Sequence, residues 1–157
     1  MKTVLVVEDE RTYARLTANW LIKNGINAHY VLSINSAKEF LSREKVDLVL
    51  SDFHLPEGTS VELLEWMQDN GFRIPFLIMT GYGDIEGAVK AIKNGADDYL
   101  TKPVQSEKVL YIINGFLTEM EEATENRQTY YRGKSPVIVK TQEYIRIVAP
   151  PPIHWLS

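Results

Sequence analysis

Charged and hydroxyl side chains stand at the ends of four short apolar runs in this sequence. Glu8 and Asp9 follow the first run, Asp52 the third, Thr80 the fourth and Lys102 the fifth. Like charges about 5 Å apart repel by about 3 kcal/mol at an effective dielectric constant of about 20, so three converging carboxylates require a cation. Carboxylate ligands in surroundings poor in His and free of Cys favour a hard divalent ion such as Mg²⁺. The pattern predicts phosphoryl transfer, with an Asp carboxylate as nucleophile and Lys102 and Thr80 holding phosphoryl oxygens.

A parallel sheet would bring these residues to one edge. The runs expected to form strands are residues 3–7, 27–32, 46–50, 74–79 and 98–100, and segments with helical spacing alternate with them. The first helix is expected to stop at Asn24-Gly25, the second to begin after Ser33 or Asn35, and the last to begin near Gln105. Two further helices are expected over 60–68 and 85–93. Five βα units with right-handed crossovers predict a doubly wound α/β fold, a three-layer sandwich with a five-stranded parallel sheet.

Apolar stripes give several of the predicted helices one face suited to packing. In the first helix the stripe is Tyr13, Leu16, Thr17, Trp20 and Leu21, and in the second it is Ala37, Phe40 and Leu41. In the fourth it is Ile85, Ala88, Val89 and Ile92, and in the last it is Val109, Ile112, Ile113, Phe116, Leu117 and Met120.

Composition narrows the class of protein. A chain of 157 residues suits one domain of about 100–150 residues with an appendage. Because 17 Lys and Arg stand against 21 Asp and Glu, for a net charge of −4, we expect no direct nucleic-acid contact. The absence of Cys excludes disulfides, thiolate zinc sites and a Cys nucleophile. Neither a signal sequence nor a run of about 18 apolar residues is found, so we expect a cytoplasmic protein without membrane contact.

Four motifs occur in an order and at spacings that resemble a known family. They are VLVVEDE, DLVLSDFHLPEG with Pro56 four residues after Asp52, LIMTGYG, and GADDYLTKPV. From Lys2 to about Leu117 the chain resembles the receiver domain of bacterial two-component response regulators, a flavodoxin-like, CheY-like fold.

The resemblance implies roles for the residues at the strand ends. Asp52 would accept a phosphoryl group from the phosphohistidine of a sensor histidine kinase. Asp9 and Asp52 would bind Mg²⁺, Glu8 would act mainly through a metal-bound water, and the backbone carbonyl of His54 would be a further ligand. Lys102 would bind a phosphoryl oxygen, and its bond to Pro103 would be cis. The imidazole of His54 has no partner at metal-ligand spacing, so we expect it to face solvent.

Thr80 and Tyr99 would form the switch pair of such a domain. The Thr80 hydroxyl would move to the new phosphate, and the Tyr99 ring would turn into the vacated space. The surface of the fourth helix, fifth strand and fifth helix would then repack, and we expect it to bias the chain toward a homodimer. The acid pair is Glu-Asp where Asp-Asp is common, which lengthens the first acid by one methylene.

The residues after the receiver resemble a different module. We expect the receiver to span 1–120 and a helical linker, EEATENRQTYY, to span 121–131. Residues 132–150 resemble the opening of the AAA+ ATPase domain of NtrC-type activators of the alternative sigma factor, where Gly133, Ser135 and Pro136 would precede a helix ending near Val148. No G-x-x-x-x-G-K-[ST] loop occurs, so we expect no ATP hydrolysis. Residues 132–157 are then either a truncated start of that domain or a Pro-rich disordered tail.

Two other functions remain open from the sequence. An Asp-nucleophile phosphatase usually needs a second acid two residues after the nucleophile, where this chain has His54. A receiver that only binds partners would not need the five site residues, all of which are present. We therefore expect a phospho-accepting switch that regulates transcription and does not turn over external substrates.

Overall fold

The computed structural model describes the backbone of residues 1–81, 84–130, 137–140 and 145–148, and the side chains of residues 1–81 and 84–118. The chain divides into two compact units, Met1–Tyr111 and Ile112–Ser157. The first unit contains the main sheet. Helix α5 (Glu107–Tyr130) begins in the first unit and continues into the second, which also contains the strands β8 (Val137–Lys140) and β9 (Ile145–Val148).

Five parallel strands form one sheet in the order β2-β1-β3-β6-β7. Their bounds are β1 (Thr3–Val7), β2 (Asn27–Val31), β3 (Leu48–Asp52), β6 (Phe76–Thr80) and β7 (Asp98–Thr101). The chain adds β2 on one side of β1 and the later strands on the other, which makes the carboxyl ends of β1 and β3 the topological switch point. The central strands are buried on both faces, as their continuous apolar runs predict.

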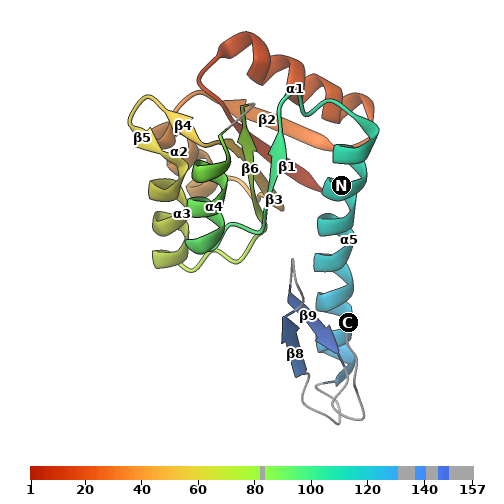
Figure 1. The fold of residues 1–157 in the computed structure, drawn as a ribbon. Coiled ribbons are helices and arrows are strands. Elements are labelled where there is room, and N and C mark those ends of the chain that lie inside the picture. The colour runs from red at the N-terminus through yellow and green to blue at the C-terminus, as the bar shows by residue number, and fades with distance from the viewer. Residues whose placement is uncertain (82–83, 131–136, 141–144, 149–157) are drawn as a thin grey trace. The chain divides into compact units, whose positions relative to one another are not determined.

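Helices cover both faces of this sheet. On one face lie α2 (Ile34–Arg43), α3 (Ser60–Asp69) and α4 (Ile85–Lys93), which share a core with Leu5, Val49 and Ile78 of the strands (Figure 1). Helix α1 (Arg11–Lys23) packs against β1 and β2, and its residues are absent from that core. The prediction of a doubly wound, three-layer α/β sandwich is confirmed.

Two strands begin and end later than the sequence predicts. Strand β3 runs to Asp52, which is thus the last residue of the strand and does not lie two residues beyond its end. Strand β6 begins at Phe76 because Pro75 lacks the N–H that a ladder needs, and it ends at Thr80. The carboxyl edge of the sheet therefore includes Asp52 and Thr80 within its hydrogen-bonded register, opposite Met79 and Thr101.

A short hairpin after Asp52 was not predicted. Strands β4 (His54–Leu55) and β5 (Gly58–Thr59) pair antiparallel, with Pro56 and Glu57 at the turn. Gly58 has φ +149°, a backbone conformation that favours glycine, and a Cβ atom at this position would collide with the carboxylate of Glu62. The hairpin fixes the path of the chain between Asp52 and α3.

The predicted apolar face of α4 is wrong for its three bulky residues and right for Ala88. Gly87, Ala88 and Ala91 are the buried residues of this helix, whereas Ile85, Val89 and Ile92 are 66%, 46% and 39% exposed. Small residues line the packed side because the helix lies close to its neighbours: a Cβ atom on Gly87 would meet the Phe53 ring at 3.0 Å. The bulky residues of the stripe consequently face outward.

The first helix shows a similar but smaller difference. Its buried residues are Ala14, Thr17, Ala18 and Leu21, so Thr17 and Leu21 are as predicted, but Leu16 is 53% exposed. In α2, Ala37 and Leu41 are buried and Phe40 is partly buried, and Ser33 is the N-cap. Ser33 accepts a hydrogen bond from the Ser36 N–H at 3.1 Å.

Helix α5 begins two residues after its predicted start and has Val109, Ile113 and Leu117 among its buried residues. Strands β8 and β9 pair antiparallel, with Val137 opposite Val148, so the helix that the AAA+ resemblance implied there is wrong. Branched apolar residues in VIVK and IRIV favour strands. The Met120 side chain, Gly133, Ser135-Pro136 and residues 149–157 lie outside the described residues. The domain bounds 1–120, 121–131 and 132–157 stay predictions.

Candidate functional site

The three acidic side chains predicted to meet do so at the carboxyl edge of the sheet. Glu8 and Asp9 follow β1, and Asp52 ends the neighbouring strand β3. One carboxylate oxygen from each lies within 4.8 Å of the others. Glu8 is buried, Asp52 is partly buried and Asp9 is exposed, so the cluster opens to solvent on one side. Carboxylate oxygens alone are ligands that suit Mg²⁺, and the residues present therefore fit this ion.

Lys102 supplies the positive charge in this cluster. It follows β7, and its ammonium Nζ lies 2.7 Å from Glu8 Oε1 and 3.1 Å from Asp52 Oδ2. Burial favours the neutral amine, but the hydrogen bond to Glu8 and the charge of Asp52 outweigh burial, and the pKa of Lys102 is raised. Lys102 is thus a fixed cation between two carboxylates. The bond from Lys102 to Pro103 is cis, as the resemblance implied.

Glu8 differs from the other acids in its environment. Its burial raises its pKa, although Lys102 and the Glu10 N–H both donate hydrogen bonds to its carboxylate. Glu8 Oε2 accepts the Glu10 N–H at 3.0 Å, and Oε1 accepts from Lys102. Both oxygens of Glu8 are therefore used, which orients this side chain within the cluster.

The predicted switch pair lies farther along the same edge. Thr80 is buried, and its hydroxyl donates to the Leu100 carbonyl at 3.4 Å. Tyr99 precedes Leu100 on β7 and is 44% exposed. The backbone N–H of Lys102 donates to the Thr80 carbonyl at 2.8 Å. Thr80 is therefore joined by hydrogen bonds to the residues on both sides of Thr101.

His54 contacts more than solvent. Its side chain is 71% exposed, but Nε2 lies 3.3 Å from Asp84 Oδ2, and the ring stands edge-on to Phe53 with centroids 4.9 Å apart. Asp84 is the N-cap of α4 and accepts the Gly87 N–H at 3.3 Å. The ring faces solvent over most of its surface, as predicted, and the imidazole in addition joins the β4–β5 hairpin to the start of α4.

Two residues near the site were missed by sequence reasoning. Tyr13 was assigned to an apolar stripe, yet its ring faces Lys102 Nζ at 4.9 Å from the centroid, and its hydroxyl accepts the Val104 N–H at 3.0 Å. Glu57, at the hairpin tip, accepts the N–H groups of Ile34 and Asn35 at 3.2 and 3.3 Å. Neither contact has a local sequence signal, because each joins segments far apart in the chain.

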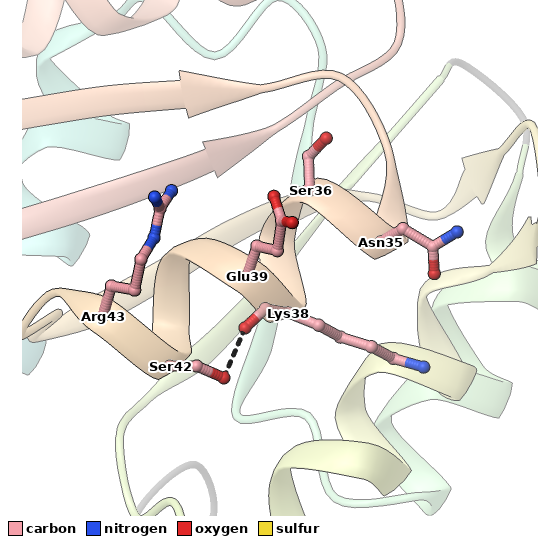
Figure 2. A pocket seen from close by; sticks show the side chains of 6 residues that line it. All are labelled: Asn35, Ser36, Lys38, Glu39, Ser42 and Arg43. Atoms are coloured by element: carbon pink, nitrogen blue, oxygen red, sulfur yellow. Dashed lines mark hydrogen bonds between the residues drawn. The ribbon is translucent and has the colours of Figure 1, made fainter.

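An open cavity of about 530 Å³ on the outer side of α2 is distinct from this cluster. Figure 2 shows the described residues that line it, Asn35, Ser36, Lys38, Glu39, Ser42 and Arg43. The Ser42 hydroxyl donates to the Lys38 carbonyl at 2.8 Å. The lining carries side chains of both charges, so its electrostatic potential does not favour an ion of either sign. We assign no chemistry to it.

A family comparison agrees with the geometry. Residues 4–114 match the model of the response regulator receiver domain. The chain belongs to this family. As a receiver domain of two-component systems, it is of a class that interacts with histidine kinases and generally binds Mg²⁺ through an acidic cluster.

Full-length relatives of this receiver domain include transcriptional regulators. This chain is 32% identical over 136 residues to the response regulator protein PilR of Pseudomonas aeruginosa, and the match covers 84% of this chain and 30% of PilR. It is 31% identical over 147 residues to the transcriptional regulatory protein GlrR of Escherichia coli, covering 93% of this chain and 33% of GlrR. The chain thus spans about a third of the length of these relatives.

Solved structures show the same fold. The receiver domain of NtrX from Brucella abortus superposes with a TM-score of 0.68 at 27% identity, covering 73% of this chain and 98% of that domain. The resemblance to receiver domains of NtrC-type activators is confirmed. Among the described residues of this receiver domain, no helix is both long and apolar enough to cross a membrane.

Proposed function

We propose that this receiver domain accepts a phosphoryl group on Asp52 from the phosphohistidine of a sensor kinase, in a reaction that requires Mg²⁺. The observation that carries the proposal is the position of the Lys102 ammonium, which contacts both Glu8 and Asp52 within the acidic cluster. A lone structural ion pair would need only one of these carboxylates.

In the proposed step an oxygen of Asp52 bonds to phosphorus as the bond from phosphorus to the imidazole nitrogen breaks. The electron pair of that bond stays on the nitrogen, so an imidazole protonated on its other nitrogen leaves as a neutral ring. Lys102 holds one phosphoryl oxygen and balances the charge of the transferred group. Glu8, Asp9, Asp52 and the backbone carbonyl of His54 would hold the metal ion, which when bound screens the repulsion between nucleophile and phosphoryl group.

The same proposal assigns the switch to Thr80 and Tyr99. Phosphorylation draws the Thr80 hydroxyl away from the Leu100 carbonyl, and the exposed ring of Tyr99 turns inward. We infer that this repacks the α4, β7 and α5 surface and biases homodimerisation. Support comes from three apolar side chains of α4, Ile85, Val89 and Ile92, that are exposed in this state. The dimer would control transcription in a longer regulator, in the cytoplasm and without nucleic-acid contact from these residues.

The chain itself would not be an enzyme acting on external substrates. The residue two positions after Asp52 is His54, whose imidazole contacts Asp84, and the 157 residues include no ATPase phosphate loop. Phosphoryl transfer to Asp52 is then a single self-modification. A partner-binding module without phosphorylation would leave the buried Glu8 and its pairing with Lys102 without a role.

The test is the mass of the chain after incubation with acetyl phosphate and Mg²⁺. We expect one added phosphoryl group, no addition for Asp52→Asn or with EDTA, and normal addition for Asp69→Asn, an exposed acid at the end of α3. Sedimentation run in parallel should show a change in association. Labelled Asp52→Asn would refute the assignment.

A further inference from the structure

Tyr13 contacts both the side chain of Lys102 and the backbone that follows it. The Lys102 ammonium lies 4.9 Å from the centroid of the Tyr13 ring. The Tyr13 hydroxyl accepts a hydrogen bond from the Val104 N–H at 3.0 Å. Tyr13 is in the first turn of α1, where Glu10 caps the helix by accepting the Tyr13 N–H at 2.6 Å. The residue is therefore anchored by its own helix.

The ring limits where the Lys102 side chain can go. A lysine has a flexible four-carbon stem, and Lys102 is 26% exposed, so its two carboxylate partners leave part of its surface open. An ammonium within about 6 Å of an aromatic centroid is attracted to the ring face. Lys102 is thus held between Glu8 and Asp52 on one side and an aromatic ring on another.

The hydroxyl fixes the backbone on the far side of Lys102. The Lys102 N–H donates to the Thr80 carbonyl at 2.8 Å, Pro103 has no N–H, and the next donor, Val104, binds Tyr13. Val104 is fully buried. The segment from Lys102 to Val104 is therefore fixed at both ends, and one of those two anchors is a side chain.

Binding of a metal ion would increase the contribution of the Tyr13 ring to holding Lys102 in place. Glu8 and Asp52 are the same carboxylates that would hold Mg²⁺, so an ion competes with Lys102 for them. The ring of Tyr13 is not a metal ligand. It is the described contact of Lys102 that remains when the carboxylates turn to the ion.

We propose that Tyr13 is a positioning residue that keeps Lys102 directed at the phosphoryl group being transferred to Asp52. Its ring holds the Lys102 ammonium, and its hydroxyl holds the backbone at Val104. This inference rests on the proposed function and goes beyond it, since it concerns how fast Asp52 is phosphorylated and not whether it is.

The test measures phosphorylation of the full chain by acetyl phosphate at saturating Mg²⁺. Tyr13→Leu should lower the second-order rate constant about 5- to 10-fold, which corresponds to about 1 to 1.4 kcal/mol. Tyr13→Phe keeps the ring and should lose about 2-fold. The Mg²⁺ dissociation constant should stay within about 2-fold in both variants. Trp20→Leu, which removes another partly exposed ring from α1, should phosphorylate at the wild-type rate. If Tyr13→Leu does not fold, Tyr13→Met fills the site with an unbranched chain.

A double-mutant cycle separates positioning from general structure. In a Lys102→Ala background, Tyr13→Leu should have no further effect on the rate, because it acts through Lys102. Wild-type rates in Tyr13→Leu, an equal loss in Trp20→Leu, or an undiminished loss without Lys102 would each overturn the inference. In all three cases the proposed function would still stand if Asp52→Asn takes up no phosphoryl group. Phosphorylation of Asp52→Asn would overturn both the proposed function and this inference.

Discussion

The imidazole of His54 lies 3.3 Å from the carboxylate of Asp84, so the hairpin after the proposed phospho-acceptor is joined to the N-cap residue of helix α4. The other oxygen of Asp84 caps the helix through the Gly87 N–H. One carboxylate therefore serves a hairpin beside the acidic cluster and the helix that the proposed switch moves. This contact gives the cluster a direct connection to α4 that does not pass through Thr80.

The two roles of Asp84 should differ in their effect on stability. Asp84→Ala removes a helix cap and should lower the free energy of unfolding by about 1 kcal/mol. His54→Ala removes only the contact of an exposed imidazole with Asp84 and should lower the free energy of unfolding by less than about 0.5 kcal/mol. Urea unfolding at neutral pH measures both. A larger loss for His54→Ala than for Asp84→Ala would show that the cap is not the main contribution.

Glu57 should stabilise the fold only while it is ionised. Burial raises the pKa of Glu57, but the N–H groups of Ile34 and Asn35 outweigh burial and lower it below 4.5. Because the folded-state pKa is lowered, the stabilisation is present above pH 4.5 and is lost as pH falls through the folded-state value. Glu57→Gln should cost about 0.5 kcal/mol at pH 7, discounted for exposure, and progressively less as the pH falls through the folded-state pKa of Glu57.

The matched control for Glu57 is Glu39→Gln, an exposed acid on α2 itself. Chemical unfolding at several pH values should show no comparable pH-dependent loss in the control. A Glu57→Gln penalty that does not shrink at any pH below 4.5 at which the chain still folds would mean that the hairpin is held by contacts other than this charge.

Glu8 should show the opposite pH dependence. Its burial raises its pKa above 4.5, so the folded chain binds this proton more tightly than the unfolded chain. As the pH falls through the raised pKa, the free energy of unfolding of the wild type should therefore increase relative to that of Glu8→Gln. The increase should level off below about pH 4.5. Unfolding in EDTA measures this, since a bound ion would hold Glu8 ionised. A difference that shrinks as the pH falls would contradict the raised pKa.

The main site could be predicted because parallel topology fixes where strands end. Glu8, Asp52, Thr80 and Lys102 each stand at the carboxyl end of a strand, and a parallel sheet brings such residues to one edge whatever their separation in sequence. The later starts of β3 and β6 did not affect this prediction, because they move the boundaries of the strands and not the edge of the sheet at which Asp52 and Thr80 lie.

The contacts that were missed depend on distances that periodicity does not encode. The ring of Tyr13 has the spacing of a core residue, and only the approach of the segment after β7 to the first turn of α1 makes it a partner of Lys102. The outward face of α4 was missed because apolar size was taken as the signal for burial. Close packing of the helix selects small residues, Gly87 and Ala91 beside the predicted Ala88, and leaves Val89 outside.

Removing Lys102 should lower the stability of the chain, and added Mg²⁺ should compensate for part of that loss. Lys102→Met leaves the buried Glu8 carboxylate beside Asp52 without its cation, which should cost about 2 kcal/mol after allowing for partial exposure. Because an ion that binds only the folded state stabilises it by mass action, added Mg²⁺ should raise the Tm of Lys102→Met more than that of the wild type. Lys93→Met, an exposed lysine on α4, should respond to Mg²⁺ as the wild type does.

The exposed stripe of α4 should be required for the association that follows phosphorylation. Ile85, Val89 and Ile92 recur at intervals of four and three residues, so they form one apolar face at the helix surface. Val89→Arg places a charge in the middle of that face, and burying it in a dimer would cost more than the lost apolar contact. Beryllofluoride-treated Val89→Arg should therefore sediment as a monomer under conditions in which the treated wild type associates.

Leu16→Arg is the matched control for Val89→Arg, because Leu16 is an equally exposed apolar residue on a different helix, α1, with 53% exposure against 46%. The control should associate like the wild type, and both variants should still accept a phosphoryl group on Asp52, since neither residue touches the acidic cluster. Association that survives Val89→Arg and is lost in Leu16→Arg would place the dimer surface on α1. In that case the outward apolar stripe of α4 would need another partner, and the proposed path from Thr80 to the dimer would have to be abandoned.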